Sequence, residues 1–244
     1  MTSTSDKIKI AHNFSKAADQ YNRYAKIQKE IASELFFMVK KHIKPGAKIL
    51  DLGCGTGFIA KLINTEFQDI EITQVDLSEK MLEKAVKIKN TKTIKADIEK
   101  LPLPYNHFDI IISSLALQWC DQKKVFKEIK RVKKPGAPVI ISTLGENSFK
   151  EIKQDFKQIK LKNLTPTYKL KEQLQEIKIP NLRVKSQLIK HEYKNLLEFF
   201  HTIKNVGANT NQRKKYFDRN LYHICKSKKN YMVSWEIIIL KNFI

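Results

Sequence analysis

Apolar residues near the start of the chain recur at intervals of three and four, which is typical of amphipathic helices. One predicted helix carries small and aromatic side chains on a single face, at Phe14, Ala17, Ala18, Tyr21, Ala25 and Gln28. A second helix follows through Ile31 to Val39, and Pro45-Gly46 then ends the helical pattern. We therefore expect residues 1–44 to form a helical cap ahead of the first strand.

Short apolar runs then alternate with helical segments. The runs lack the period-two alternation of half-exposed strands, so they predict strands buried on both faces, at 48–52, 70–75, 91–96, 108–113 and 138–143. Between them we expect a helix capped by Ser78 that extends to Ile88, and another helix over 123–132. Buried strands separated by helices favour an α/β fold with a doubly wound, mostly parallel Rossmann-like sheet.

The pattern changes after Gly145. Helices are predicted over 149–159, 170–177, 195–206 and 212–226, and strands over 182–191 and 232–240, which brings the sheet to seven strands. We interpret the last two helices as a lid. Because the sequence has no repeat and no long linker, we expect residues 1–244 to form a single domain. Its parts are the helical cap 1–44, a cofactor-binding core 45–145, and the remaining sheet with its helical lid, 146–244.

Composition narrows the class of protein. The chain is 42% hydrophobic and 29% charged, with 7 Gly and 7 Pro, which excludes collagen-like and broadly disordered classes. No apolar stretch is long enough for a secretory signal or a membrane span, so we expect a cytoplasmic protein without a membrane partner. Three scattered cysteines suggest reduced thiols, and the histidines lack metal-ligand spacing, so no metal is predicted.

The formal net charge is +21, from 46 basic and 25 acidic residues. Such an excess could attract nucleic acid or an acidic protein partner. The basic residues are mostly lysine, and the chain is also rich in Ile and Asn, a bias that an AT-rich genome would produce without selection for binding. The charge therefore leaves both origins open.

A glycine turn is the sharpest local motif. The first predicted strand, 48–52, carries Asp51 next to its end and runs into Gly53-Cys54-Gly55-Thr56-Gly57 before a helix. Glycines at such a turn permit positive φ and a close approach of ligand to backbone. Phe58 stands where a dinucleotide fingerprint needs its last glycine, so the motif is GxGxG.

Two acidic residues accompany this turn. Asp76, followed by Leu77, ends the next strand, where a carboxylate can accept both hydroxyls of a ribose. Asp97 ends the third strand, beside the expected position of a base. A doubly wound sheet places a glycine turn, a ribose acid and a base-edge acid in this order around one nucleoside.

Over about residues 48–144 the pattern resembles the class I S-adenosylmethionine-dependent methyltransferases. The resemblance implies S-adenosylmethionine as the cofactor. It places Asp51 and Gly53 at the amino-acid end, Asp76 at the ribose, and Asp97 with Ile98 at the adenine. The complete set of cofactor-binding residues it implies is Asp51, Gly53, Gly55, Gly57, Asp76, Leu77, Asp97 and Ile98.

Segments outside that core make the resemblance more specific. FSKAADQYNRYAKIQ at 14–28, SLALQWC at 114–120, STLGENSFKEI at 142–152 and IKNVGAN at 203–209 together resemble the malonyl-acyl carrier protein O-methyltransferases of biotin synthesis. One departure is Pro135-Gly136-Ala137-Pro138, where many relatives have Pro-Gly-Gly, at a turn remote from the proposed chemistry. The resemblance implies methyl transfer to the free carboxylate of a malonyl thioester on acyl carrier protein.

This reaction needs no strong base, because the accepting carboxylate is already ionised at neutral pH. It needs alignment of the reacting atoms and removal of water from the nucleophile. We place Tyr21, Gln118 and Trp119 at this step. Each also has a structural interpretation, with Tyr21 and Trp119 as packing residues and Gln118 as a helix cap. Asn209 either approaches the thioester or occupies a left-handed turn.

Two other functions use the same core. The chain could methylate RNA or another small molecule, or it could be a catalytically silent subunit that binds cofactor or carrier protein without turnover. No RNA-binding module is evident, and the intact glycines and acids favour an active enzyme. We expect a monomer without a nucleic-acid partner. Part of the basic excess would dock the carrier protein on the lid region, about Lys150 to Lys228, through lysines such as Lys153, Lys157, Lys160, Lys214 and Lys215.

Overall fold

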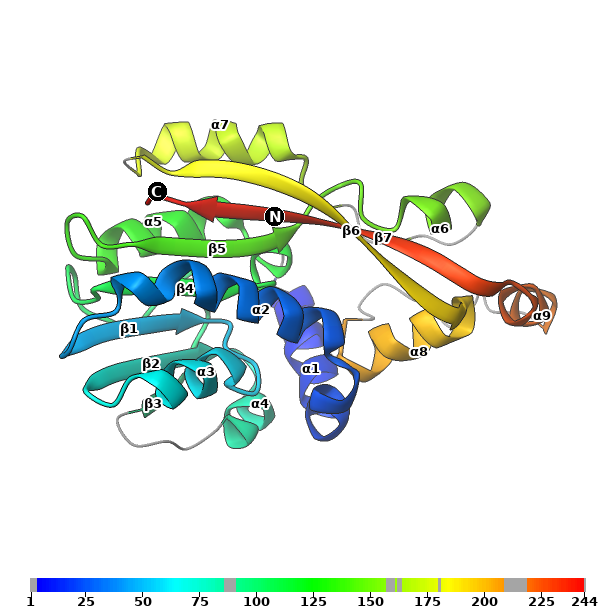
Figure 1. Cartoon of the computed structure of the whole chain (residues 1–244), viewed down its shortest axis with the longest axis horizontal. Helices are drawn as coiled ribbons and strands as arrows, with labels where there is room; N and C mark the ends of the chain where they lie inside the picture. Colours follow the sequence, from blue (N-terminus) through cyan, green and yellow to red (C-terminus); the bar gives the residue numbers. More distant parts are fainter. Residues whose placement is uncertain are drawn as a thin grey trace.

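A seven-stranded sheet runs through the centre of the protein, with helices packed on both faces (Figure 1). The computed structural model describes residues 4–85, 91–156, 161, 164–179, 181–208 and 219–243. The strands are β1 (Ala47–Leu52), β2 (Ile70–Asp76), β3 (Thr91–Lys95), β4 (Ile110–Ser114), β5 (Val139–Leu144), β6 (Arg183–Asn195) and β7 (Lys229–Lys241). Their order in the sheet is β3-β2-β1-β4-β5-β7-β6, which confirms the predicted doubly wound arrangement.

The last strand along the chain is inserted between two earlier ones. β7 pairs antiparallel with β5 on one side and with β6 on the other, whereas the pairs among β1 to β5 are parallel. β6 and β7 pair from Arg183↔Lys241 to Asn195↔Lys229 and are longer than the sequence predicted. They extend beyond the other strands, and α8 (Leu196–Asn205) and α9 (Arg219–Ser227) lie on this extension (Figure 1).

Two helices precede the sheet, α1 (Thr4–Tyr24) and α2 (Lys26–Val39). α1 begins ten residues before the predicted apolar face, and the chain bends at Ala25, which has φ −80° and ψ 44° and is fully buried. The predicted continuous face is therefore wrong beyond Tyr24, because Ala25 and Gln28 belong to the bend and to α2. This bend lets α1 leave the sheet surface while α2 stays packed on it (Figure 1).

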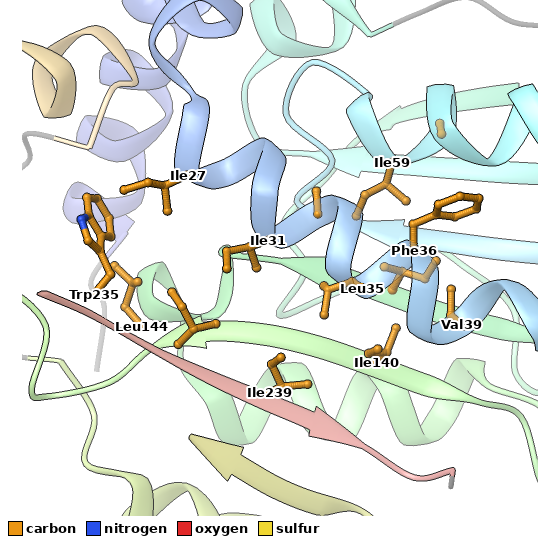
Figure 2. Close-up of a cluster of buried hydrophobic side chains, with 14 of the residues drawn as sticks. Ile27, Ile31, Leu35, Phe36, Val39, Ile59, Ile140, Leu144, Trp235 and Ile239 are labelled. Atoms are coloured by element: carbon orange, nitrogen blue, oxygen red, sulfur yellow. The ribbon is translucent and has the colours of Figure 1, made fainter. Parts of the chain in front are cut away.

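The larger apolar cluster lies under α2. Ile31 and Leu35 are fully buried and face Ile140 of β5 and Ile239 of β7 (Figure 2). α3 (Phe58–Glu66) contributes Ile59 to the same cluster. A Leu-to-Ala change at such a site typically costs about 2–5 kcal/mol of stability, so this packing fixes α2 and with it the start of the bend.

The opposite face of the sheet is covered by α5 (Gln122–Val132) and α7 (Thr167–Ile177). Asp121 caps α5 by accepting a hydrogen bond from the backbone N–H of Lys124. The short helix η1 (Lys40–His42) follows α2, and η2 (Leu117–Trp119) follows β4. None of the described helices is long and apolar enough to cross a membrane.

Two predicted helices are shorter in the structure. Ser78 caps α4 (Glu79–Lys84) as expected, but this helix ends at Lys84, before the predicted Ile88, and 86–90 lie outside the described residues. α6 (Lys150–Asp155) likewise ends before the predicted residue 159, and 157–160 lie outside the described residues. The first part of the predicted helix 212–226 lies outside the described residues, which resume with α9.

Candidate functional site

The glycine turn joins β1 to α3 at the carboxyl end of the sheet. Gly53, Gly55 and Gly57 have φ values of +68°, +54° and +76°, a region that favours glycine. A Cβ on Gly53 would lie 2.4 Å from the Cβ of Ala116, so a larger residue would collide with the segment after β4. The turn therefore keeps its backbone open to a ligand.

Asp76 holds this turn from the end of β2. Its Oδ2 accepts a hydrogen bond from the N–H of Gly55 at 2.9 Å, and its Oδ1 accepts one from the N–H of Ser78 at 2.8 Å. Burial raises the pKa of Asp76, and the backbone hydrogen bonds oppose that rise. Each carboxylate oxygen keeps a second lone pair, so Asp76 can still accept two ligand hydroxyls.

Asp51 at the end of β1 is a buried acid without a partner. Asp51 is 1% exposed, and among the described residues neither of its carboxylate oxygens has a hydrogen-bond partner. Burial and the nearby Asp76 raise the pKa of Asp51 to about 7. A buried carboxylate is stabilised when a cation or hydrogen-bond donors reach it, so this position suits the ammonium group of a ligand.

A first cavity lies where α1 crosses the carboxyl ends of the strands. Of the predicted site residues, the cavity is lined by Tyr21, Gly53, Gly55, Asp76, Leu77, Asp97, Ile98 and Trp119. Lys7 and Phe14 of α1 also line it, and the ring of Phe14 meets that of Trp119 edge to face at 5.7 Å. The first helix of the cap therefore covers this cavity.

A second cavity adjoins the first. It is lined by Asp51 together with Lys29 and Thr56, and the Lys29 ammonium donates to the carbonyl of Asn22 at 2.7 Å. Tyr21, Gly53, Gly55 and Ser114 line both cavities. Burial and the charge of Asp76 raise the pKa of Tyr21, so its hydroxyl stays protonated at neutral pH and can donate a hydrogen bond.

Two predicted residues do not line either cavity. Gly57 caps α3, and its N–H donates to the carbonyl of Cys54 at 3.0 Å. Gln118 turns its amide to the protein, donating to the carbonyl of Leu115 at 2.6 Å and accepting from the hydroxyl of Thr143 at 3.2 Å. Substrate contact by Gln118 stays a prediction.

Several other predicted residues lie outside the described ranges: Asn209, Lys157, Lys160, Lys214 and Lys215. α8, the first helix of the predicted lid, packs against α1, and neither α8 nor the described helix α9 lines the two cavities. A Cβ on Gly207, just after α8, would lie 2.8 Å from the Cα of Phe14. The lid therefore supports the helix that covers the site.

Lys7 is a site residue that the sequence analysis missed. Its ammonium lies 2.5 Å from Oδ2 of Asp97 and 2.6 Å from Oε2 of Glu99, and the side chain is 16% exposed. Burial lowers its pKa, but the hydrogen bonds to both acids raise it more, so Lys7 is charged. The three-and-four spacing of the first helix, extended backwards from Phe14 and Ile10, reaches Lys7 and could have found it.

The arrangement suits a nucleoside that carries an amino-acid side arm. Asp76 and Asp97, which could accept hydrogen bonds from ribose hydroxyls and from a base, line the first cavity, and the carboxylate of Asp51, without a hydrogen-bond partner among the described residues, lines the second. Within the described ranges, no group of three or more His, Cys, Asp or Glu residues could hold a metal ion.

Known sequences are similar to this chain over nearly its whole length. Residues 50–141 match a family described as "Methyltransferase domain". A protein of Ilyobacter polytropus named malonyl-[acyl-carrier protein] O-methyltransferase 2 is 31% identical over 98% of this chain and 96% of its own length. A malonyl-[acyl-carrier protein] O-methyltransferase of Buchnera aphidicola is 32% identical over 92% of this chain and 88% of its own length.

Solved structures share the fold. The YcgJ protein of Bacillus subtilis is similar with a TM-score of 0.61 at 16% identity, over 86% of this chain and 97% of that one. The phosphoethanolamine N-methyltransferase 2 of Haemonchus contortus, in complex with S-adenosyl-L-methionine, has a TM-score of 0.54 at 23% identity, over 85% of this chain and 52% of that one.

Proposed function

Because the chain belongs to the malonyl-[acyl-carrier protein] O-methyltransferase family, we propose how its own residues carry out that reaction. The enzyme transfers a methyl group from S-adenosylmethionine to the free carboxylate of a malonyl group on acyl carrier protein. The observation that carries this proposal is the extent of the likeness, which includes the helical cap and the lid as well as the cofactor core.

The residues of the two cavities fit the cofactor. When bound, S-adenosylmethionine supplies the electrophilic methyl group of a sulfonium ion. Asp51 would hold its ammonium group, because a buried carboxylate with two free acceptor oxygens needs a positive partner. Asp76 would accept the ribose hydroxyls, and Asp97 with Ile98 would lie along the adenine. Gly53 and Gly55 keep the backbone accessible between these groups.

On the substrate side, we assign Tyr21 the main role. Its ring lines both cavities, and its Oη lies 4.0 Å from the point that a Cβ on Gly55 would occupy, so the hydroxyl reaches the glycine turn. A protonated phenol can donate to the malonyl carboxylate and replace part of the water that this anion loses. Trp119 and Phe14 would shield the same space from solvent.

No residue has to remove a proton, since the accepting carboxylate is ionised at neutral pH. The work of the protein is to align the carboxylate oxygen with the methyl group and to exclude water. The methyl ester that forms has no charge at that end, so it can enter chain elongation as an ordinary fatty-acid primer would. This product fits the place in biotin synthesis that the family resemblance implies.

The proposal includes the partner and the setting of the enzyme. We expect a monomer that acts in the cytoplasm, with acyl carrier protein as its protein partner and without nucleic acid or membrane. Exposed lysines of the lid region, among them Lys150 and Lys153 of α6, would attract the acidic carrier protein. In this proposal part of the basic excess speeds the encounter with the carrier protein.

A direct assay tests the activity. Labelled S-adenosylmethionine is offered together with malonyl-acyl carrier protein, free malonate or bulk RNA, and the label is followed by mass spectrometry. We expect label on the malonyl group as an ester that mild base removes, and little on the other two acceptors. Labelled RNA with unmodified malonyl-carrier protein would overturn the proposal, as would cofactor binding without transfer to any acceptor.

A further inference from the structure

Gln74, in the middle of β2, is a buried polar residue without a partner. It is 0% exposed, and among the described residues neither its amide nitrogen nor its amide oxygen has a hydrogen bond. Gln74 lines neither cavity, and the proposed mechanism does not use it. A buried amide without hydrogen-bond partners destabilises a fold, so we ask which partner the Gln74 side chain has.

The sheet register places Gln74 beside Asp51. The two residues are paired in register on adjacent parallel strands, β1 and β2. Ile49 and Ile72, two residues earlier on each strand, belong to one apolar cluster, so Asp51 and Gln74 extend toward that same face of the sheet. Neighbouring strands are about 4.8 Å apart, which leaves the two side chains within reach of one another.

The two groups are chemically complementary. Asp51 has two oxygens that accept hydrogen bonds, and the Gln74 amide has two N–H groups that donate them. Since they do not bond directly, a single water between them could accept from the amide and donate to the carboxylate. The second cavity reaches Asp51 and offers the polar space that such a water requires.

We propose that Gln74 is a positioning residue of the cofactor site, which holds the Asp51 carboxylate ionised and oriented through one buried water. The inference rests on the proposed function, in which Asp51 receives the cofactor's ammonium group. Gln74 itself does not touch the cofactor.

The charges around Asp51 make the amide important. Asp76 and the Cys54 thiol face it from the neighbouring strand end and the turn, Tyr21 faces the same space from α1, and Lys29 lines the cavity from α2. Burial and the charge of Asp76 already raise the pKa of Asp51 to about 7. Loss of a hydrogen-bond donor raises that pKa further, and the protonated acid no longer attracts an ammonium ion.

The test compares two ligands over a range of pH. S-adenosylhomocysteine carries the ammonium group, and 5′-methylthioadenosine lacks the amino-acid part. Their affinities are measured by calorimetry from pH 6 to pH 9 for the wild type, for Gln74→Leu, and for Gln74→Met as a second variant in case the branched side chain prevents folding. Gln173→Leu is the matched control, because Gln173 also has a buried amide oxygen without a partner but lies on α7, away from the cavities.

The wild type and Gln173→Leu should bind S-adenosylhomocysteine more weakly as the pH falls below about 7. In the Gln74 variants this decline should begin about one pH unit higher, which weakens binding about fivefold at pH 7 and little at pH 9. Binding of 5′-methylthioadenosine should stay within about twofold of the wild type, because it does not use Asp51.

Equal losses for both ligands would show a general structural defect and overturn the proposal. An unchanged pH profile for S-adenosylhomocysteine would overturn it as well. If the wild type bound neither ligand at any pH, the cofactor assignment itself would fail. That result is distinct from a wild type that binds S-adenosylhomocysteine and a Gln74 variant that behaves identically.

Discussion

Replacing Asp76 by alanine removes the carboxylate that links the glycine turn to the proposed ribose site. Its two oxygens accept hydrogen bonds from the N–H groups of Gly55 and Ser78, and in our proposal their remaining lone pairs accept the ribose hydroxyls. Hydrogen bonds to a charged group contribute about 1.5–3 kcal/mol, so Asp76→Ala should weaken cofactor binding roughly ten- to hundredfold. The freed backbone N–H groups should also lower the midpoint of thermal unfolding.

A second effect of the same substitution has the opposite sign. The charge of Asp76 helps to raise the pKa of Asp51 to about 7, so removing it lowers the pKa of Asp51. At pH 6 the variant therefore has a larger ionised fraction of Asp51 than the wild type, in which a pKa of about 7 leaves most of this carboxyl protonated. The loss of affinity should therefore be larger at pH 8 than at pH 6.

Calorimetric titration with S-adenosylhomocysteine at both pH values measures these effects. Asp69→Ala is the control, because Asp69 is exposed and lies at the other end of β2. Unchanged affinity at both pH values in a folded Asp76→Ala protein would refute the ribose assignment. Equal losses at the two pH values would refute the coupling between Asp76 and Asp51.

Three further substitutions test the rest of the site. Tyr21→Phe keeps the ring and should reduce kcat while cofactor affinity holds; wild-type turnover would leave Tyr21 as a packing residue. Gly53→Ala forces a Cβ to within 2.4 Å of Ala116 at positive φ, so cofactor affinity should fall about tenfold, with partial recovery in the double variant Gly53→Ala/Ala116→Gly. Exchanging Lys150 and Lys153 for glutamate should raise KM for malonyl-carrier protein at low salt but not for a small malonyl thioester. Equal changes in KM for the two substrates would show that these lysines do not dock the carrier protein.

The parallel core could be predicted from the sequence because its strands are fully buried and therefore almost continuously apolar. The bend between the first two helices could not be predicted from the sequence. It occurs at Ala25, the best helix-forming residue type, without the glycine or proline that usually marks a break. Packing decides it instead, since α2 must lie on β4 and β5 while α1 turns toward the ends of the strands.

The candidate site likewise has residues that the sequence predicts and contacts that it does not. Asp51, Asp76 and Asp97 lie at or just after the carboxyl ends of β1, β2 and β3, where the sheet topology brings them together. The amide of Gln118 forms its hydrogen bonds with Leu115 and Thr143. The local sequence does not indicate whether such an amide bonds to the protein or to a substrate. Lys7 and Asp97 are 90 residues apart in the chain, and their contact depends on where α1 crosses the sheet. No local sequence pattern specifies that crossing point.

The insertion of β7 between β5 and β6 sets the order in which a ribosome can complete the fold. β1 to β5 emerge in time to pair with one another, but β6 emerges with no neighbour and must wait for Lys229–Lys241. At about 5–20 residues per second, this leaves the edge of β5 and the whole of β6 unpaired for seconds during each round of synthesis. Open strand edges promote aggregation, so the interval before β7 arrives is the time at which a nascent chain of this enzyme most needs a chaperone.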